Sequence, residues 1–173
     1  MPVVLPVNDL FRQTIVIGVG HSSVGNNPNA TLITYALGSC IGMVVYAAGI
    51  NAGGILHYML PDSTLSPEKA VAQPAMFADT GLPHFLRSLK GIQATPANLK
   101  CALFGGAAVL SGEDYFKVGE RNIAAARVLT TIYRLRVVHS AVGGNYNRTV
   151  SLNLATGLVT VKTPNGVSTV SLA

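Results

Sequence analysis

The chain is short of charged and large aromatic side chains, and these shortages exclude some classes of protein. Trp is absent from the 173 residues, and charged residues make up 11% of them against 49% hydrophobic residues. A sequence with so little charge and so much apolar surface is not intrinsically disordered. The length fits one domain with its own core, so we expect a single domain over residues 1–173, with residues 1–12 as a flexible N-terminal arm.

Clusters of basic residues are missing as well. Twelve Lys and Arg against seven Asp and Glu give a net charge of +5, but the basic residues are scattered along the chain. Nucleic-acid-binding domains gather their basic residues in runs or on one face, so we expect no nucleic-acid partner. The positive balance is ordinary solubility charge, or it steers the protein toward an acidic partner.

No Asp, Glu, Lys or Arg occurs between residues 13 and 61. A membrane-spanning helix needs about 20 mostly apolar residues, but glycines at 38, 42, 49, 53 and 54 interrupt this stretch. We therefore expect consecutive buried strands and no membrane span. The N-terminus lacks the basic start and long apolar run of a secretory signal, so we expect a cytoplasmic protein with free thiols.

Periodicity and turn residues predict an α+β domain. Residues 119–134 form the clearest predicted helix, with Ala124, Val128, Ile132 and Leu135 on one face and three arginines largely away from it. Residues 68–90 have a helical pattern, in which Pro74 and Pro83 are expected near helix starts. Strands are predicted over residues 14–18, 32–35, 41–46, 53–59, 99–104, 137–142, 149–154 and 158–162, with a last short strand after the Asn165-Gly166 turn.

Cofactor and metal motifs are weak or absent. Gly18-Val19-Gly20 follows a predicted strand, but Ser23 replaces the third glycine of a dinucleotide fingerprint and no helical pattern follows. The histidines at 21, 57, 84 and 139 and the two cysteines lack zinc-ligand spacing. We therefore expect no cofactor and no metal.

Cys40 is the most informative single residue. It follows Gly38-Ser39 where one predicted strand gives way to the next, a turn that can expose a nucleophile. His57 is expected on the adjacent antiparallel strand, within reach of Cys40. Spacing alone leaves open a buried structural cysteine and a surface histidine.

The other candidate nucleophiles are weaker. Ser39 is rejected because a nucleophile elbow would need glycines where Leu37 and Ile41 stand. Cys101 lies in an apolar strand and is expected in the core, and His84 and His139 are expected to be structural.

Several motifs, in order, resemble the CheD family of chemoreceptor glutamine deamidases. Residues 34–42 (TYALGSCIG) resemble its signature, and residues 53–61 (GGILHYMLP) resemble its histidine segment. Matches continue at residues 103–107, at 119–122, and at 142–144 followed by Arg148, so that the similarity spans roughly residues 14–162. The chain departs from the family pattern at Ala47, Ala141 and Asn147.

The resemblance implies a catalytic set of Cys40, His57 and Thr34, although a strand position alone favours a plain β-sheet threonine at 34. It implies a layered α/β/β sandwich similar to the catalytic domain of cytotoxic necrotizing factor toxins. The implied activity is hydrolysis of glutamine side-chain amides on the helical cytoplasmic domains of chemoreceptors. A second implied partner is a CheC-like phosphatase. The alternative function is a catalytically silent binding module that docks on receptors or on that phosphatase.

Overall fold

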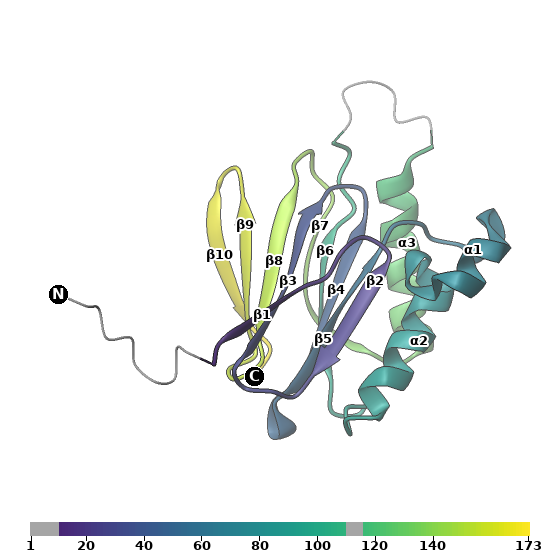
Figure 1. Cartoon of the computed structure of the whole chain (residues 1–173). Helices are drawn as coiled ribbons and strands as arrows, with labels where there is room; N and C mark the ends of the chain where they lie inside the picture. The colour runs from purple at the N-terminus through teal and green to yellow at the C-terminus, as the bar shows by residue number, and fades with distance from the viewer. Residues whose placement is uncertain (1–10, 110–115) are drawn as a thin grey trace.

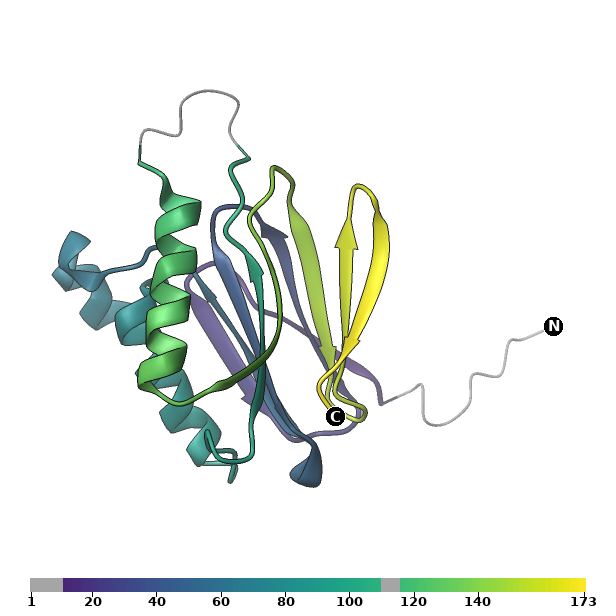
Figure 2. The same ribbon diagram turned by 180° about the vertical axis from the view of Figure 1, so that it is seen from behind.

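The structure is a computed structural model that describes residues 11–109 and 116–173. Two five-stranded sheets pack face to face, and the helices cover the outer face of one of them (Figures 1 and 2). The α+β class expected from the sequence is confirmed. Residues 1–10 of the expected N-terminal arm lie outside the described residues, and Phe11 and Arg12 are exposed.

The strands of each sheet come from distant parts of the chain. Sheet A runs β1 (Gln13–Val16), β3 (Ala30–Leu37), β8 (Arg148–Asn153), β9 (Leu158–Thr163) and β10 (Gly166–Ser171). Sheet B runs β2 (His21–Gly25), β5 (Ala52–Tyr58), β4 (Ile41–Ala47), β6 (Lys100–Gly105) and β7 (Arg136–Val142). The helices are α1 (Pro67–Ala72), α2 (Ala78–Lys90) and α3 (Val118–Ile132), with short 3₁₀ turns η2 (Ala48–Ile50), η3 (Ser63–Leu65) and η4 (Pro74–Met76).

Sheet B is the middle layer, which explains much of the long uncharged stretch. Every residue of β4 and β5 is buried. Val44 and Ile55 face sheet A, whereas Met43 and Leu56 face the helices. A strand covered on both faces cannot carry an unpaired charge, which explains the later part of the uncharged run; β1 and β2, in its earlier part, are exposed or half-buried and not the buried strands that we expected. Within residues 11–109 and 116–173, no helix has the length and apolar character needed to cross a membrane.

The buried face of α3 differs from the predicted one. Gly119, Asn122, Ala126 and Thr130 are buried, while Val128 and Ile132 are 58% and 63% exposed and Ala124 is exposed too. The first turn of the helix lies so close to the loop after β6 that a Cβ on Gly119 would come within 2.6 Å of the Gly106 carbonyl oxygen. The fully buried positions carry small or polar side chains, Ile123 and Leu129 pack on the core beside them, and the predicted apolar step of four residues faces solvent. Arg121, Arg127 and Arg134 are exposed, as expected.

Two further predictions need correction. Pro83 lies inside α2, five residues beyond its first residue, not near its start; the helix continues past it because one missing N–H removes a single hydrogen bond. Strand β2 was not predicted, because an edge strand with the sequence HSSVG has no apolar alternation. Pro74, in contrast, begins η4 as expected.

Candidate active site

A β-bulge and a tight turn place Cys40 at one end of the sandwich. The pairing of β3 with β8 shifts register between Thr34 and Leu37, and Ala36 in this bulge has a left-handed φ of 55°. A left-handed non-glycine residue is strained, and such strain concentrates at functional sites. After the bulge, Gly38-Ser39 turns the chain into β4, so that Cys40 stands just before the strand, partly exposed.

The glycine-rich loop that follows β6 holds this turn in place. The backbone N–H of Ala107 donates to the Gly38 carbonyl at 2.8 Å, and that of Gly106 donates to the Cys40 carbonyl at 2.8 Å. Gly105 and Gly106 both have positive φ, of 103° and 65°. A side chain at Gly105 would collide with the Cys40 carbonyl, so the close approach of the two segments requires glycine there.

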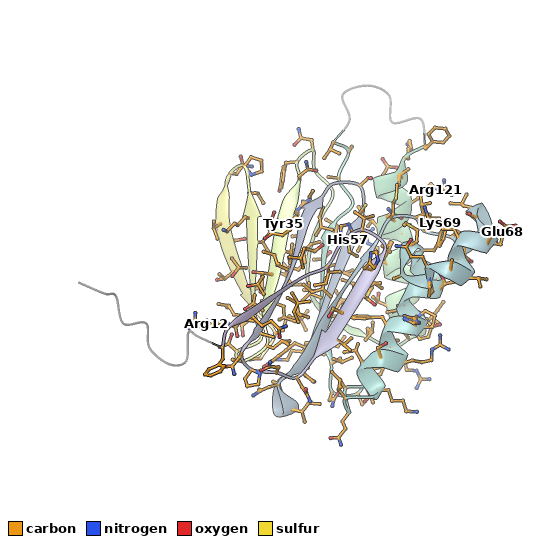
Figure 3. The ribbon with its side chains drawn as sticks, viewed as in Figure 1. Arg12, Tyr35, His57, Glu68, Lys69 and Arg121 are labelled. Carbon is orange, nitrogen blue, oxygen red and sulfur yellow. The ribbon has the colours of Figure 1, made fainter. Side chains whose placement is uncertain are left out.

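His57 lies on the strand next to Cys40, as predicted. It pairs with Gly42 on β4 and with His21 on β2. His57 follows Ile55 by two residues on β5, so the two side chains point to the same face of the strand, toward sheet A. Cys40 packs on that side as well. Cys40 precedes Gly42 by two residues, which makes it the diagonal neighbour of His57 across the antiparallel pair. The exposed-histidine alternative is wrong, because His57 is fully buried within the body of the molecule (Figure 3).

Thr34 connects the two sheets at this point. Its Oγ1 lies 2.7 Å from His57 Nδ1, and the same hydroxyl donates to the carbonyl of Ile17 at 2.7 Å. A hydroxyl has one proton, and here that proton goes to Ile17. Oγ1 therefore accepts a hydrogen bond from Nδ1–H, which in a neutral imidazole leaves Nε2 with its lone pair free.

The Nε2 atom of His57 is poised to accept a proton. It is buried and has no hydrogen-bond partner among residues 11–109 and 116–173. Burial, together with the nearby His21, lowers the pKa of His57 to about 4. The ring is therefore neutral at physiological pH.

The two cysteines differ in their surroundings. Burial raises the pKa of Cys40 above its ordinary value, while its own backbone N–H acts in the opposite direction. Cys101 is fully buried, as expected, and burial raises its pKa to about 12. Both thiols are free. At rest, the site thus contains a protonated Cys40 thiol and a neutral His57 ring. Of the two cysteines, only Cys40 has access to solvent.

Asn122 is a buried site residue whose contacts pattern reasoning did not reveal. Its side-chain Nδ2 donates to the carbonyls of Ser39 at 2.9 Å and Met59 at 2.8 Å, and its backbone carbonyl accepts from the Tyr58 hydroxyl at 2.7 Å. The only sequence signal was the motif match at residues 119–122. An amide on the buried face of a helix gives no hint of which distant carbonyls it will meet.

Arg148 shapes the second loop beside the Cys40 turn. It is 4% exposed, donates to the Gly143 carbonyl at 2.8 Å and covers the Tyr146 ring, with the guanidinium carbon 4.5 Å from the ring centre. The next residue back, Asn147, departs from the family pattern; its Oδ1 would lie 2.9 Å from a Cβ on Gly38. Glycine at 38 therefore makes room for the asparagine.

The other departures and candidate ligands lie in ordinary positions. Ala47 is buried at the far end of β4, and Ala141 packs between the sheets. His139 stacks against Phe104, with ring centres 5.6 Å apart. In the described part of the chain, no three His, Cys, Asp or Glu side chains lie together as a metal-binding group.

Comparison with known proteins identifies relatives over most of the chain. A family model described as CheD chemotactic sensory transduction matches residues 59–163. The chain is 38% identical over 152 residues to the "Probable chemoreceptor glutamine deamidase CheD 1" of Syntrophus aciditrophicus, covering 88% of this chain and 95% of the relative. It is 40% identical over 145 residues to the "Probable chemoreceptor glutamine deamidase CheD" of Solibacter usitatus, covering 84% and 86%.

A more distant relative and a solved structure complete the comparison. The chain is 34% identical to the protein of the same name from the archaeon Pyrococcus abyssi, covering 88% and 93%. A crystal structure of Neisseria meningitidis protein NMB0706 superposes with a TM-score of 0.48 at 11% identity, covering 79% of this chain and 66% of that one. The sequence relatives and the family model carry the assignment: the chain belongs to the CheD family.

Proposed function

We propose that this protein hydrolyses the side-chain amide of glutamine residues in chemoreceptors, which yields glutamate and releases ammonia. The relatives named above carry that activity in their names. The observation that carries the proposal is the hydrogen-bond chain from His57 through Thr34 to Ile17. It leaves Nε2 unprotonated on the face of sheet B where Cys40 stands, as a general base requires.

In the proposed first step, Cys40 Sγ attacks the glutamine side-chain carbonyl carbon while its proton passes to His57 Nε2. The neutral state of both groups at rest makes this transfer part of the attack, not an ion pair formed beforehand. The imidazolium then gives its proton to the departing ammonia, and a thioester remains. Water, activated by the same imidazole, hydrolyses the thioester to glutamate and restores the thiol.

The negative oxygen that forms on the carbonyl needs hydrogen-bond donors. The backbone N–H of Cys40 acts on its own thiol but donates to no backbone carbonyl of another described residue, so it can donate to that oxygen. In other hydrolases, one such donor lowers the activation free energy by about 3–4 kcal/mol. Thr34 acts by holding the imidazole in the productive tautomer.

Location, a second partner and a likeness in fold are also part of the proposal. We place the protein in the cytoplasm, where free thiols persist and where the helical signalling domains of receptors would meet it. Docking on a CheC-like phosphatase and similarity to the cytotoxic necrotizing factor catalytic domain remain predictions from the sequence resemblance. A silent binding module would need neither an exposed thiol nor an oriented base, so the site favours the enzyme.

The decisive experiment is mass spectrometry of a receptor cytoplasmic fragment incubated with the wild-type protein or with Cys40→Ala. Each deamidation adds about 1 Da and releases one ammonia, as conversion of an amide to an acid demands. We expect the mass gain with wild type only. A receptor fragment that binds wild type but gains no mass would refute the enzyme and support the binding module.

A further inference from the structure

Asn122 joins the two chain segments that carry the proposed nucleophile and base. Its Nδ2 donates one proton to the carbonyl of Ser39, which precedes Cys40, and the other to the carbonyl of Met59, two residues after His57. Two carbonyl oxygens can be faced only by the NH₂ end of the amide, so the side-chain orientation is determined. The segments are far from α3 in sequence, 83 and 63 residues away.

This contact sets the direction of the Cys40 N–H. The Ser39–Cys40 peptide is trans, and in a trans peptide the carbonyl and the following N–H point in opposite directions. Asn122 draws the Ser39 carbonyl toward α3. The Cys40 N–H is therefore turned away from α3, toward the side of sheet B on which the His57 ring lies.

The Asn122 amide is only half satisfied, because its NH₂ end meets two carbonyls and its oxygen meets no donor in the described part of the chain. Asn122 is fully buried, and its Oδ1 has no hydrogen-bond partner among the described residues. A buried acceptor without a partner is unfavourable, but an apolar residue here would leave the Ser39 and Met59 carbonyls without their donor. Thr130, two turns further along the same buried face, differs from Asn122 in its hydrogen-bond partners. Its hydroxyl donates only within the helix, to Ala126 or Arg127, and bonds to no distant segment of the described chain.

We infer that Asn122 is a positioning residue for the reaction: it fixes the Cys40 turn against the end of β5, so that the thiol meets His57 Nε2 and the Cys40 N–H faces the oxyanion. This inference rests on the proposed function for its role in deamidation. The contacts to Ser39 and Met59 carry the geometric part, which can be tested without a receptor.

The test uses Asn122→Asp, which keeps the side-chain size but cannot donate to either carbonyl when ionised. Asn122→Ala is the second variant, in case a buried carboxylate prevents folding. We expect kcat for receptor deamidation to fall by about 100-fold or more, since a misplacement of about 1 Å has that effect. KM should stay within about threefold of wild type, because substrate binding is not removed.

Thr130→Val is the matched control, since it removes a buried hydroxyl from the same helix face without touching the Cys40 turn. Thermal unfolding measures the stability of each variant, and activity is compared per folded molecule. We expect Thr130→Val to keep wild-type kcat even though it is destabilised. Folded Asn122→Asp and Asn122→Ala proteins that both keep kcat within about threefold of wild type would overturn the inference.

Alkylation of Cys40 by iodoacetamide separates this inference from the proposed function. The reaction needs the thiol and its base but no glutamine. If even the wild type fails to deamidate receptors, the proposed function is wrong and the alkylation rate alone decides. A rate about tenfold lower in the Asn122 variants would then support positioning of Cys40 against His57, and an unchanged rate would refute it.

Discussion

The two ends of β4 are built on different principles. At the far end, the Tyr46 hydroxyl lies 3.0 Å from the Leu154 carbonyl and 3.1 Å from Asn51 Oδ1, so its single proton has an acceptor. At the Cys40 end, two buried atoms have no partner among residues 11–109 and 116–173: His57 Nε2 and Asn122 Oδ1.

The difference separates stability from chemistry. Satisfied polar groups stabilise a buried layer, whereas an unpartnered one lowers stability unless it serves something else. Thr34, His57, Asn122 and Arg148, four of the five buried polar side chains of the described residues, lie near the Cys40 end. Thr34 and Arg148 are hydrogen-bonded there, whereas His57 and Asn122 each keep one atom without a partner among the described residues, a cost that the proposed chemistry would explain.

Removal of the proposed nucleophile is the largest change expected at the Cys40 end. Cys40→Ala should abolish ammonia release from a receptor fragment, because no other thiol reaches solvent, and should leave the thermal midpoint near that of wild type. Cys101→Ala should do the reverse: full activity, with stability lowered by the lost side chain in a packed core. A Cys40→Ala protein that keeps one tenth of wild-type activity, about a 1.4 kcal/mol change in barrier, would rule out the assignment.

The pH dependence of activity tests His57. With a pKa of about 4, the base loses its lone pair only in strong acid, so kcat/KM should rise with pH through a midpoint near 4, not near the ordinary histidine value of about 6.5. His57→Gln should lose activity at every pH. A wild-type midpoint near 6.5 would contradict this expectation, because it would mean that the imidazole that acts as the base is exposed to solvent.

The same lowered pKa predicts the sign of a stability effect. Between the folded pKa of about 4 and the unfolded value of about 6.5, the unfolded chain binds more protons at this position. The free energy of unfolding should therefore fall as pH drops through this window, by at most about 3 to 4 kcal/mol. Urea titrations of wild type and His57→Gln at several pH values isolate this contribution, which should be absent from the variant.

Thr34 should have a smaller effect than either partner. Thr34→Val keeps the shape of the side chain but removes the hydroxyl between Nδ1 and the Ile17 carbonyl. The imidazole can then adopt the wrong tautomer, so we expect kcat to fall by about 10- to 100-fold. Thr34→Ser restores the hydroxyl and should recover most of the rate. Equal rates for Thr34→Val and Thr34→Ser would show that the hydroxyl does not orient His57.

Tyr46→Phe, at the far end of β4, should have the smallest effect on activity. It removes one buried hydroxyl and leaves the Leu154 carbonyl without that donor, which should lower the free energy of unfolding by about 1–2 kcal/mol. Deamidation by the folded protein should be unchanged. A large loss of kcat in this variant would mean that the two ends of the strand are coupled, which would remove the basis of the comparison.

The sequence predicted the parts of this molecule that depend on local pattern. The uncharged run identified the buried strands of sheet B, and the hairpin of β4 and β5 placed His57 beside Cys40. Thr34 was different: it lies in the other sheet and reaches His57 across the core, so only the family resemblance singled it out.

The failures arise where packing overrides pattern. The exposed face of α3 carries Val128 and Ile132, whereas its fully buried positions hold small or polar residues and its first turn lies against the loop after β6. Asn122 belongs to the same case: its value depends on two carbonyls brought to it by the fold. Periodicity counts apolar residues and cannot measure how near two layers come.

The strands of sheet A come from both ends of the chain, which affects the order in which the sheet can form during synthesis. Strands β1 and β3 are made first, all of sheet B is complete by β7, and β8 to β10 are made last. Until β8 leaves the ribosome, β3 lacks the neighbour that pairs with it along most of its length. Long-range pairings of this kind form late. We therefore expect the strand that carries Thr34 to settle against His57 only after β8 has been made, so that the nascent chain holds the Cys40 thiol before the His57 ring is oriented.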